Sequence, residues 1–478
     1  MKRILFIDFH NFSPHIETSF ELAKRHLDEG DQVKFFFLGH NVPYHEHLVS
    51  FRLKTPLYHR WLPEGRAARL IRHPNFEFTS AVRLPIDLSA IRKPQTLEEL
   101  KAVTYRGADI GMGVASSIIS RTRNSLVDPS RHKEMVRNAL AGCVAVYDYS
   151  RYLLESYHPD ILYIFNGRLC HPRAVLRAAE HLDIRARIHE RGADMTKFVV
   201  RDFTPHNRKK VQEDVVSMWS GVAGSASSVA TAERWFAERR AGQPRDWHSF
   251  TASQWQGLLP PVESGKKIVT YFSSSDDEFA AIGDEFLWEG WRDQIDAVEG
   301  LVRTMRGRND SQLIIRIHPH LAQKHPDDLA RWLAVAKHDP EVIVIEPGSP
   351  IDSYALLDAS DLVVSGGSTI GLEAVYWGKP SILLGPSDYD QLGAVHLAHT
   401  EDMLKELLDN ERLSSSQETA LPYAYYRATF GETFRYFEPR GLSGGRFLGE
   451  DIHQLPRVPR LFNQLRHLVL GSTRPRRV

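Results

Sequence analysis

The chain opens with a short apolar run, a segment of helical periodicity and a second apolar run. Residues 4–7 are uniformly apolar, which is typical of a buried strand, and apolar positions recur at helical spacing over residues 15–29. Residues 33–38 then predict a second strand, so the chain starts with a βαβ unit of the Rossmann type. The G-x-G-x-x-G signature is missing from this unit, so a dinucleotide ligand is not indicated.

A second α/β series begins after residues 256–266, which hold two prolines and two glycines and form the best candidate linker. Strand and helix patterns then alternate, which predicts a parallel sheet covered by helices on both faces. We predict three regions, namely a Rossmann-like domain over residues 1–257 with an insertion at about 45–100, a second over residues 266–400, and a helical, aromatic tail over residues 401–478. The tail is expected to pack back across both domains. Ligands of such sheets bind at the carboxyl ends of the strands, so we expect the site in a cleft between the domains.

The amino-acid composition argues against several classes of function. Lys and Arg together number 60 and so do Asp and Glu, so the basic surface of a nucleic-acid-binding domain is not expected. The two cysteines, Cys143 and Cys170, do not suggest a disulfide scaffold and fit a reduced cytoplasm. Asp8 and His10 interrupt the first apolar run too early for a signal peptide, and no segment reaches the ~20 apolar residues of a membrane span. We therefore expect a cytoplasmic protein.

Polar residues follow several predicted strands of the second domain. Arg316 and His318 flank the end of the strand at residues 313–317, where alternation would put both on one face. A cation and an imidazole donor at this place suit a nucleotide phosphate. The alternative is an Arg–carboxylate pair beside a capping histidine.

A glycine-rich turn leads from a strand into a helix at residues 365–374. Gly367 would let the backbone approach a ligand, Ser368 and Thr369 would add hydroxyls, and the helix start would offer N–H groups to phosphate oxygens. Glu373 lies one turn beyond Thr369 and could accept hydrogen bonds from a ribose. The alternative is a plain N-cap made by Ser368 or Thr369.

A run of three serines and three acids, at residues 273–278, follows the first strand of the second domain. Ser274 and Ser275 would face the cleft, and Asp276 or Asp277 could act as base, nucleophile or metal ligand. The alternative is a solvated helix start, where acids complement the helix dipole.

The first domain carries polar residues at two of its own strand ends. Glu190 and Arg191 end one predicted strand, and Arg168 follows the preceding one. Glu190 and Arg191 could also pair with each other and serve only the structure. His15 lies in the first loop, where an acceptor would approach, and also fits an ordinary helix start.

Taken together, these motifs resemble those of the capsule polysaccharide biosynthesis glycosyltransferases, which include the retaining β-Kdo transferases. Asn-Gly-Arg, His-Glu-Arg-Gly, Ser-Ser-x-Asp-Glu, His-Pro and Ser-Thr-x-Gly-x-Glu-Ala occur in the family order over roughly residues 160–385. The His-Pro and Ser-Thr pair is also similar to that of bacterial sialyltransferases. The resemblance implies an α/β fold of the GT-B type, in which two Rossmann-like domains face each other across a cleft. The first domain would be the acceptor side, and the second would bind the nucleotide sugar.

The same resemblance implies roles for single residues. His318, with Ser368 and Thr369, would contact the phosphate of CMP, and Glu373 would contact the nucleotide. Asp277 would be the nucleophile, with Asp276 as the uncertain neighbour.

Glu190 would be the acid/base of the reaction. The expected activity is transfer of a CMP-activated ulosonic acid, such as Kdo, to a growing glycan or glycolipid of the bacterial surface. No cofactor and no metal are expected, because Arg316, His318 and the helix start could neutralise the phosphate.

Two other functions fit part of the pattern. A UDP-sugar 2-epimerase shares the fold and a similar glycine-rich run, and a glycan-binding export component would need only the fold. The basic residues of the tail could contact anionic lipid at the membrane, or could form an ordinary solvated end; they are Arg474, Arg476 and Arg477.

Overall fold

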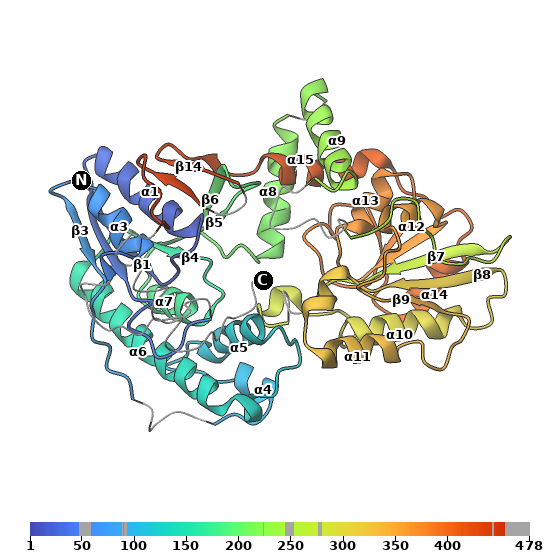
Figure 1. Ribbon diagram of the computed structural model, residues 1–478, viewed down its shortest axis with the longest axis horizontal. Helices are drawn as coiled ribbons and strands as arrows, with labels where there is room; N and C mark the ends of the chain where they lie inside the picture. Colours follow the sequence, from blue (N-terminus) through green and yellow to red (C-terminus); the bar gives the residue numbers. More distant parts are fainter. Residues whose placement is uncertain are drawn as a thin grey trace.

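The structure is a computed structural model that describes residues 1–46, 59–87, 89, 93–222, 224–243, 253–275, 280–441 and 444–454. Two α/β domains lie side by side, and a group of helices lies between them (Figure 1). The basic tail residues of the sequence analysis fall outside the described residues.

The first domain is built on a seven-stranded sheet with the spatial order β13-β6-β5-β4-β1-β2-β3. Its strands are β1 (Arg3–Asp8), β2 (Gln32–Phe37), β3 (Phe76–Thr79), β4 (Ile161–Phe165), β5 (Ala186–Arg191), β6 (Lys197–Arg201) and β13 (Glu432–Thr433). The strands from β5 to β3 are parallel, and β6 and β13 add antiparallel pairings at one edge. The parallel part has the Rossmann order 3-2-1-4-5, as the opening βαβ pattern predicts. The region at about 45–100 contributes β3, which extends this sheet.

Helices cover both faces of the first sheet because the side chains of β1 alternate between two cores. Ile4 and Phe6 pack in one core and Leu5 and Ile7 in the other, as the two-residue period of a strand requires. The helices of this domain are α1 (His15–Asp28), α3 (Pro63–Leu70), α4 (Leu97–Lys101), α5 (Ile110–Thr122), α6 (Lys133–Tyr157) and α7 (Cys170–Glu180).

The second domain has a six-stranded, fully parallel sheet with the order β12-β11-β10-β7-β8-β9. Its strands are β7 (Lys267–Phe272), β8 (Ser311–Arg316), β9 (Ile343–Ile345), β10 (Leu362–Ser365), β11 (Ser381–Leu383) and β12 (His396–Leu397). Its helices are α10 (Gln294–Met305), α11 (Pro326–Ala334), α12 (Ser353–Ala359), α13 (Ile370–Tyr376) and α14 (Glu401–Asp409). This order is again that of a Rossmann domain, so the predicted parallel sheet is confirmed.

Three helices, α8 (Arg208–Ser220), α9 (Ala226–Arg240) and α15 (Leu421–Thr429), pack together between the domains (Figure 1). The predicted first domain, residues 1–257, includes α9, but Phe236 of this helix stacks on Tyr376 of α13 with ring centroids 4.0 Å apart. After α15 the chain returns to the first domain, where β13 pairs with β6 and the hairpin of β14 (Phe437–Pro439) and β15 (Gly445–Phe447) follows.

The domains also touch directly on the side away from these helices. Ser125 Oγ donates to Asp328 Oδ1 at 2.8 Å, and the backbone N–H of His325 donates to the carbonyl of Arg123 at 3.1 Å. Two Rossmann-like domains joined in this way, with the chain returning at its end to the first, form a fold of the GT-B type. No helix in the described ranges is long and apolar enough to cross a bilayer.

The contact between α9 and α13 gives a test of the fold. Phe236 is fully buried, so Phe236→Ala should destabilise the second domain by about 3–5 kcal/mol through the lost transfer energy and the cavity left behind. The measurement is the urea midpoint of unfolding, followed by circular dichroism. Tyr152, which is 63% exposed, provides the control, and Tyr152→Ala should leave the midpoint near that of the wild type. Equal midpoints for the two variants would show that the contact between Phe236 and Tyr376 does not stabilise the packing of α9 on the second domain.

Candidate active site

Glu190 lies at the carboxyl edge of the first sheet and is held by neighbours from three segments. Asn166 Nδ2 donates to Glu190 Oε2 at 2.7 Å, the backbone N–H of Arg191 donates to Oε1 at 3.0 Å, and His15 Nδ1 lies 3.4 Å from Oε1. These residues meet because Phe165 and His189 are register partners in the parallel pair β4–β5, so Asn166 and Glu190 leave the sheet at one level. The Glu190 side chain keeps 23% of its surface exposed. A carboxylate that is oriented and still reachable can exchange a proton with a bound molecule.

A buried polar chain lies under Glu190. Ser19 Oγ donates to Asp8 Oδ2 at 2.6 Å and lies 2.9 Å from His189 Nε2. Burial lowers the pKa of His189 to about 3, so its ring is neutral at neutral pH, and burial raises the pKa of Asp8. These hydrogen bonds join β1, α1 and β5, and they therefore fix the strand end that carries Glu190.

Arg168 and Arg191 lie beside this carboxylate. The backbone N–H of Arg168 donates to Asn166 Oδ1 at 3.1 Å, and Arg191 pairs with Phe198 in the β5–β6 ladder. Arg168 also lines a pocket of about 230 Å³ to which the second domain contributes Ile282 and Glu285. The first-domain residues of the predicted site are thus brought together next to a pocket shared by both domains.

The serine run and the His-Pro motif meet at the carboxyl edge of the second sheet. Phe272 and Arg316 are register partners, so the segments after β7 and β8 leave the sheet side by side. The backbone N–H of His318 donates to Ser273 Oγ at 2.8 Å, and Ser275 Oγ lies 3.5 Å from His320 Nδ1.

His318 Nδ1 accepts a hydrogen bond from the backbone N–H of His320 at 3.2 Å. The capping histidine of the sequence analysis is therefore present. Burial lowers the pKa of His318 to about 3, with the charge of His320 adding to the effect, so the ring is neutral and carries its proton on Nε2. Nε2 is the donor atom of this ring.

Gly366 and Gly367 form a turn that has no room for side chains. A Cβ on Gly366 would lie 2.5 Å from Tyr271 Oη, and Gly367 has φ +133° with Pro386 O only 2.8 Å from its Cβ position. Ser274 Oγ lies 3.5 Å from that same position; it is buried and has no hydrogen-bond partner within the part of the chain that is described. An unsatisfied buried hydroxyl beside a bare backbone turn is suited to a ligand oxygen.

Arg316 is not directed at the serine run. Its side chain is 2% exposed and donates to the carbonyl of Glu346 at 2.5 Å, with longer contacts to Ser349 O and Ser353 Oγ at 3.4 Å. The strand ends at Arg316, so the alternation that would align Arg316 with His318 does not continue. The partners are backbone carbonyls and a serine, not the carboxylate of the alternative interpretation. Burial lowers the pKa of this guanidinium to about 10, and its charge contributes to the low pKa of His318.

Glu373 is 1% exposed and already has protein donors on both oxygens. Arg239 Nε donates to Oε1 at 2.9 Å and Tyr354 Oη donates to Oε2 at 2.6 Å. Thr369 Oγ1 accepts from Arg239 Nη2 at 2.9 Å and donates to Glu373 Oε1, and it does not cap α13. Ser368 contributes its carbonyl, which accepts from Tyr389 Oη at 2.5 Å. Glu373 and Thr369 therefore anchor α9 to the glycine-rich turn.

Asp276 and Asp277 lie outside the described residues, so their position relative to Glu190 and His318 stays a prediction.

Sequence reasoning missed Asp388, which lies in the loop after β11 at the same edge of the second sheet. Burial raises the pKa of Asp388 to about 6, opposed by Arg427 and reinforced by Asp390. Its neighbour Asp390 pairs with Arg208 and accepts from Gln212 Nε2 at 2.7 Å, both from α8. Only the tertiary structure brings these charges together, so no local pattern could have indicated this residue.

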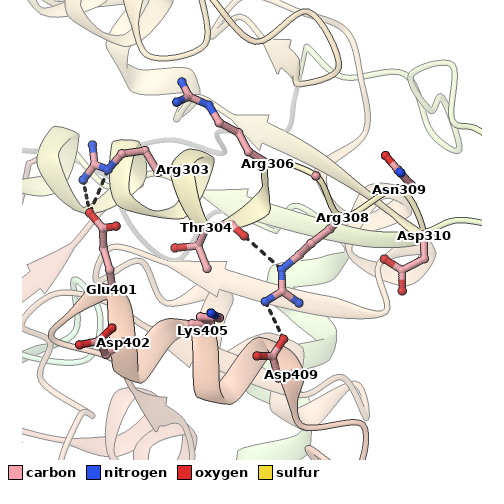
Figure 2. Close-up of a pocket in the computed structure, with 11 residues that line it drawn as sticks. Arg303, Thr304, Arg306, Arg308, Asn309, Asp310, Glu401, Asp402, Lys405 and Asp409 are labelled. Carbon is pink, nitrogen blue, oxygen red and sulfur yellow. Dashed lines mark hydrogen bonds and ion pairs between the residues drawn. The ribbon is translucent and has the colours of Figure 1, made fainter.

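A pocket of about 720 Å³ lies at the opposite end of the second sheet, between α10 and α14 (Figure 2). Its charged residues pair with one another, as Arg303 does with Glu401 and Arg308 with Asp409. It borders the start of β8, about 16 Å along the strand from the His318 end at ~3.3 Å per residue. We therefore do not assign the candidate site to this pocket.

No protein-family model matches the chain, and no curated protein matches it. Among solved structures, KpsC from Thermosulfurimonas dismutans, a beta Kdo 2,4 transferase, is similar at 14% identity over 56% of this chain and 79% of its own, with a TM-score of 0.38. UDP-GlcNAc 2-epimerase from Neisseria meningitidis aligns at 12% identity over 97% and 100%, with a TM-score of 0.27. The glycosyltransferase SnogD from Streptomyces nogalater aligns at 15% identity over 90% and 95%, with a TM-score of 0.25. Because these TM-scores are low, we draw no function from the likenesses, and the fold assignment rests on the strand orders above.

The raised pKa of Asp388 predicts a pH-dependent stability. Between about pH 4 and pH 6 the folded protein binds a proton at Asp388 that the unfolded chain releases, so this group costs stability as the pH rises through that window. Asp388→Asn removes the buried charge and should be more stable than wild type above pH 6, by up to about 3 kcal/mol, with the difference vanishing near pH 4.

Urea unfolding across this pH range measures the effect. Asp202→Asn is the control, because Asp202 is 58% exposed and its ion pairs with Arg185 and Arg187 are worth little. A stability difference for Asp388→Asn that does not change with pH would contradict the raised pKa.

Proposed function

We propose that the protein is a glycosyltransferase that moves a sugar from a nucleotide-activated donor to a glycan or glycolipid acceptor. One observation carries the proposal. In the second domain, three strand ends bring Ser274, His318 and the Gly366–Gly367 turn together at one sheet edge, with a buried hydroxyl that has no hydrogen-bond partner among the described residues. This sheet edge would accommodate the phosphate of a nucleotide. In the first domain, the oriented Glu190 would transfer the proton.

The donor we propose is a CMP-activated ulosonic acid such as Kdo, for a surface polysaccharide of a bacterium. The support is the resemblance of the His-Pro and Ser-Thr motifs together with the neutral imidazole of His318, whose Nε2–H donates to an anionic oxygen. Arg316 acts on this phosphate through its charge and not through contact, since its hydrogen bonds go to the loop at residues 346–353. Ser275 and Ser368 border the same edge.

For the chemistry we propose two displacements. A carboxylate of the second domain, Asp277 or its neighbour Asp276, attacks the anomeric carbon, and the bond to the CMP phosphate breaks. Glu190 then takes the proton of the acceptor hydroxyl, whose oxygen attacks the same carbon and releases the carboxylate. His15 and Asn166 orient Glu190 for this step, because they hold both of its oxygens.

A thermal-shift comparison of CMP, CDP, UDP and GDP tests the donor class. CMP should give the largest shift, and at 100 times its Kd it adds about 2.7 kcal/mol of stability. A clear preference for UDP would remove the Kdo assignment. Conversion of UDP-GlcNAc by the protein without an acceptor would identify an epimerase instead.

Ser274→Ala separates ligand binding from stability. The hydroxyl has no partner to lose among the described residues, so the free protein should be as stable as wild type or slightly more so, while CMP binding weakens by about 0.5–1.5 kcal/mol. The matched control is Ser360→Ala, because Ser360 is also buried but is bonded to Leu356 O and Thr270 Oγ1. The control should lose stability and keep its affinity for CMP. Isothermal titration and urea unfolding give both quantities, and unchanged affinity in Ser274→Ala would place the nucleotide elsewhere.

Glu190→Gln keeps an acceptor for Asn166 and removes the carboxylate that would take the proton of the acceptor hydroxyl. Release of CMP from CMP-Kdo over many turnovers should fall by about 10²-fold or more, whereas CMP affinity stays at the wild-type value. Glu213→Gln, on the exposed face of α8 and paired only with Lys210 among the described contacts, should behave as wild type. Full turnover in Glu190→Gln would refute its role as acid/base.

A further inference from the structure

Metal-ligating side chains gather in the interior of the first domain, apart from the residues used above. They come from the loop after β2, from α6 and from the first residues of α7, and they are Glu46, Cys143, Cys170 and His171. Cys143, Cys170 and His171 are completely buried, and Glu46 is 2% exposed. Nothing in the proposed transfer reaction uses them.

Three of these ligand atoms are close enough to share one ion, and a Glu46 oxygen lies near one of the three. One ligand atom from each of Cys143, Cys170 and His171 lies within 4.8 Å of the others. Cys170 Sγ lies 3.2 Å from His171 Nδ1 and 3.7 Å from Glu46 Oε2. In a tetrahedral zinc site with bonds of ~2.0–2.3 Å, neighbouring ligand atoms lie roughly 3.3–3.8 Å apart, so the two separations from Cys170 Sγ need little change. Glu46 would have to approach Cys143 and His171 to complete the set.

The surroundings have the features of a second coordination shell. His10 Nε2 lies 2.8 Å from Glu46 Oε1, while the other oxygen, Oε2, is the one near Cys170 Sγ, so His10 orients the carboxylate. The backbone N–H of Cys170 donates to Ser117 Oγ at 2.9 Å, and the ring of His171 stacks on Phe9 with centroids 5.3 Å apart.

We propose that Cys143, Cys170, His171 and Glu46 bind one Zn²⁺ ion in a closed, structural site. Two sulfur ligands and an imidazole select zinc over magnesium or calcium, which prefer oxygen ligands. Four protein ligands leave no open position for a substrate, so the ion stabilises the domain and does not enter the reaction. The proposal does not depend on the transferase function, and it does not conflict with the expectation that the donor phosphate needs no metal, because the two sites lie in different domains.

The ion would support the acid/base side of the site through packing. The ring centroids of His10 and Phe165 lie 5.0 Å apart, and those of Phe165 and His15 lie 4.1 Å apart. His15 in turn contacts Glu190. Fixing Glu46 therefore fixes His10 and, through Phe165, the surroundings of His15. Loss of the ion should loosen this region as well as lower the stability of the domain.

The metal content of the full-length wild-type protein, purified without chelator and dialysed, gives the first test. We expect one zinc per chain by plasma mass spectrometry, and the two thiols should react with Ellman's reagent only after a strong chelator or denaturant is added. Replacement by Co²⁺ should give the intense d–d bands of a tetrahedral site and a thiolate-to-cobalt charge-transfer band. A chain with no bound zinc, or with Cys143 and Cys170 joined as a disulfide after purification under reducing conditions, would overturn the proposal.

Variants then locate the ion. Cys143→Ser and Cys170→Ser should each lose the bound zinc and the charge-transfer band, and His10→Gln should weaken zinc binding by about 10–100-fold, the usual effect of removing a second-shell partner. His26→Ala is the matched control, because His26, Glu29 and Asp31 form another cluster of ligand atoms in the same domain. It should retain one zinc. If His26→Ala loses the zinc while both cysteine variants keep it, the ion belongs to that cluster and the assignment is wrong. Since none of these readouts is an activity, failure here would leave the transferase proposal untouched.

Discussion

The contact of α9 with α13 is the interaction on which the arrangement of the second domain and its neighbours depends. Phe236 and Tyr376 stack almost in parallel, at 4.0 Å and 6°, and this packing carries Arg239 to Glu373 and Thr369. Glu373 is buried, so without the guanidinium of Arg239 and the hydroxyl of Tyr354 the burial of its carboxylate would be unfavourable. One aromatic contact and one ion pair to a buried carboxylate thus fix the helix layer beside the glycine-rich turn.

The first domain depends on a different kind of constraint. Its interior holds acids and histidines at the ends of β1, β4 and β5, where apolar side chains would be buried at a lower cost in free energy. Each group is stabilised by a specific partner, as Asp8 is by Ser19, and burial keeps His189 neutral. Such a network gives one geometry for Glu190, because the loss of any partner leaves an unsatisfied polar atom.

The two halves of the candidate site therefore differ in character. On the first domain, orientation comes from side chains that contact Glu190 directly. On the second domain, it comes from the backbone, since Tyr271, Gln294 and Pro386 pack so closely against Gly366 and Gly367 that no side chain fits there. An oriented carboxylate and a tightly packed backbone turn with a hydroxyl beside it suit proton transfer and anion binding respectively.

The sequence by itself determined the two parallel sheets, because strand and helix periods are local and survive without tertiary information. It also determined that Asn166, Glu190, the serine run and His318 lie at strand ends, since each directly follows or ends a buried run. The tertiary structure alone decided what those side chains contact. Arg316 bonds to loop carbonyls, Glu373 bonds to an arginine 134 positions earlier in the chain, and Asp388 meets charges from α8 and α15. Partners so distant along the chain are selected by packing and by the need to compensate every buried charge, and neither leaves a periodic trace in the sequence.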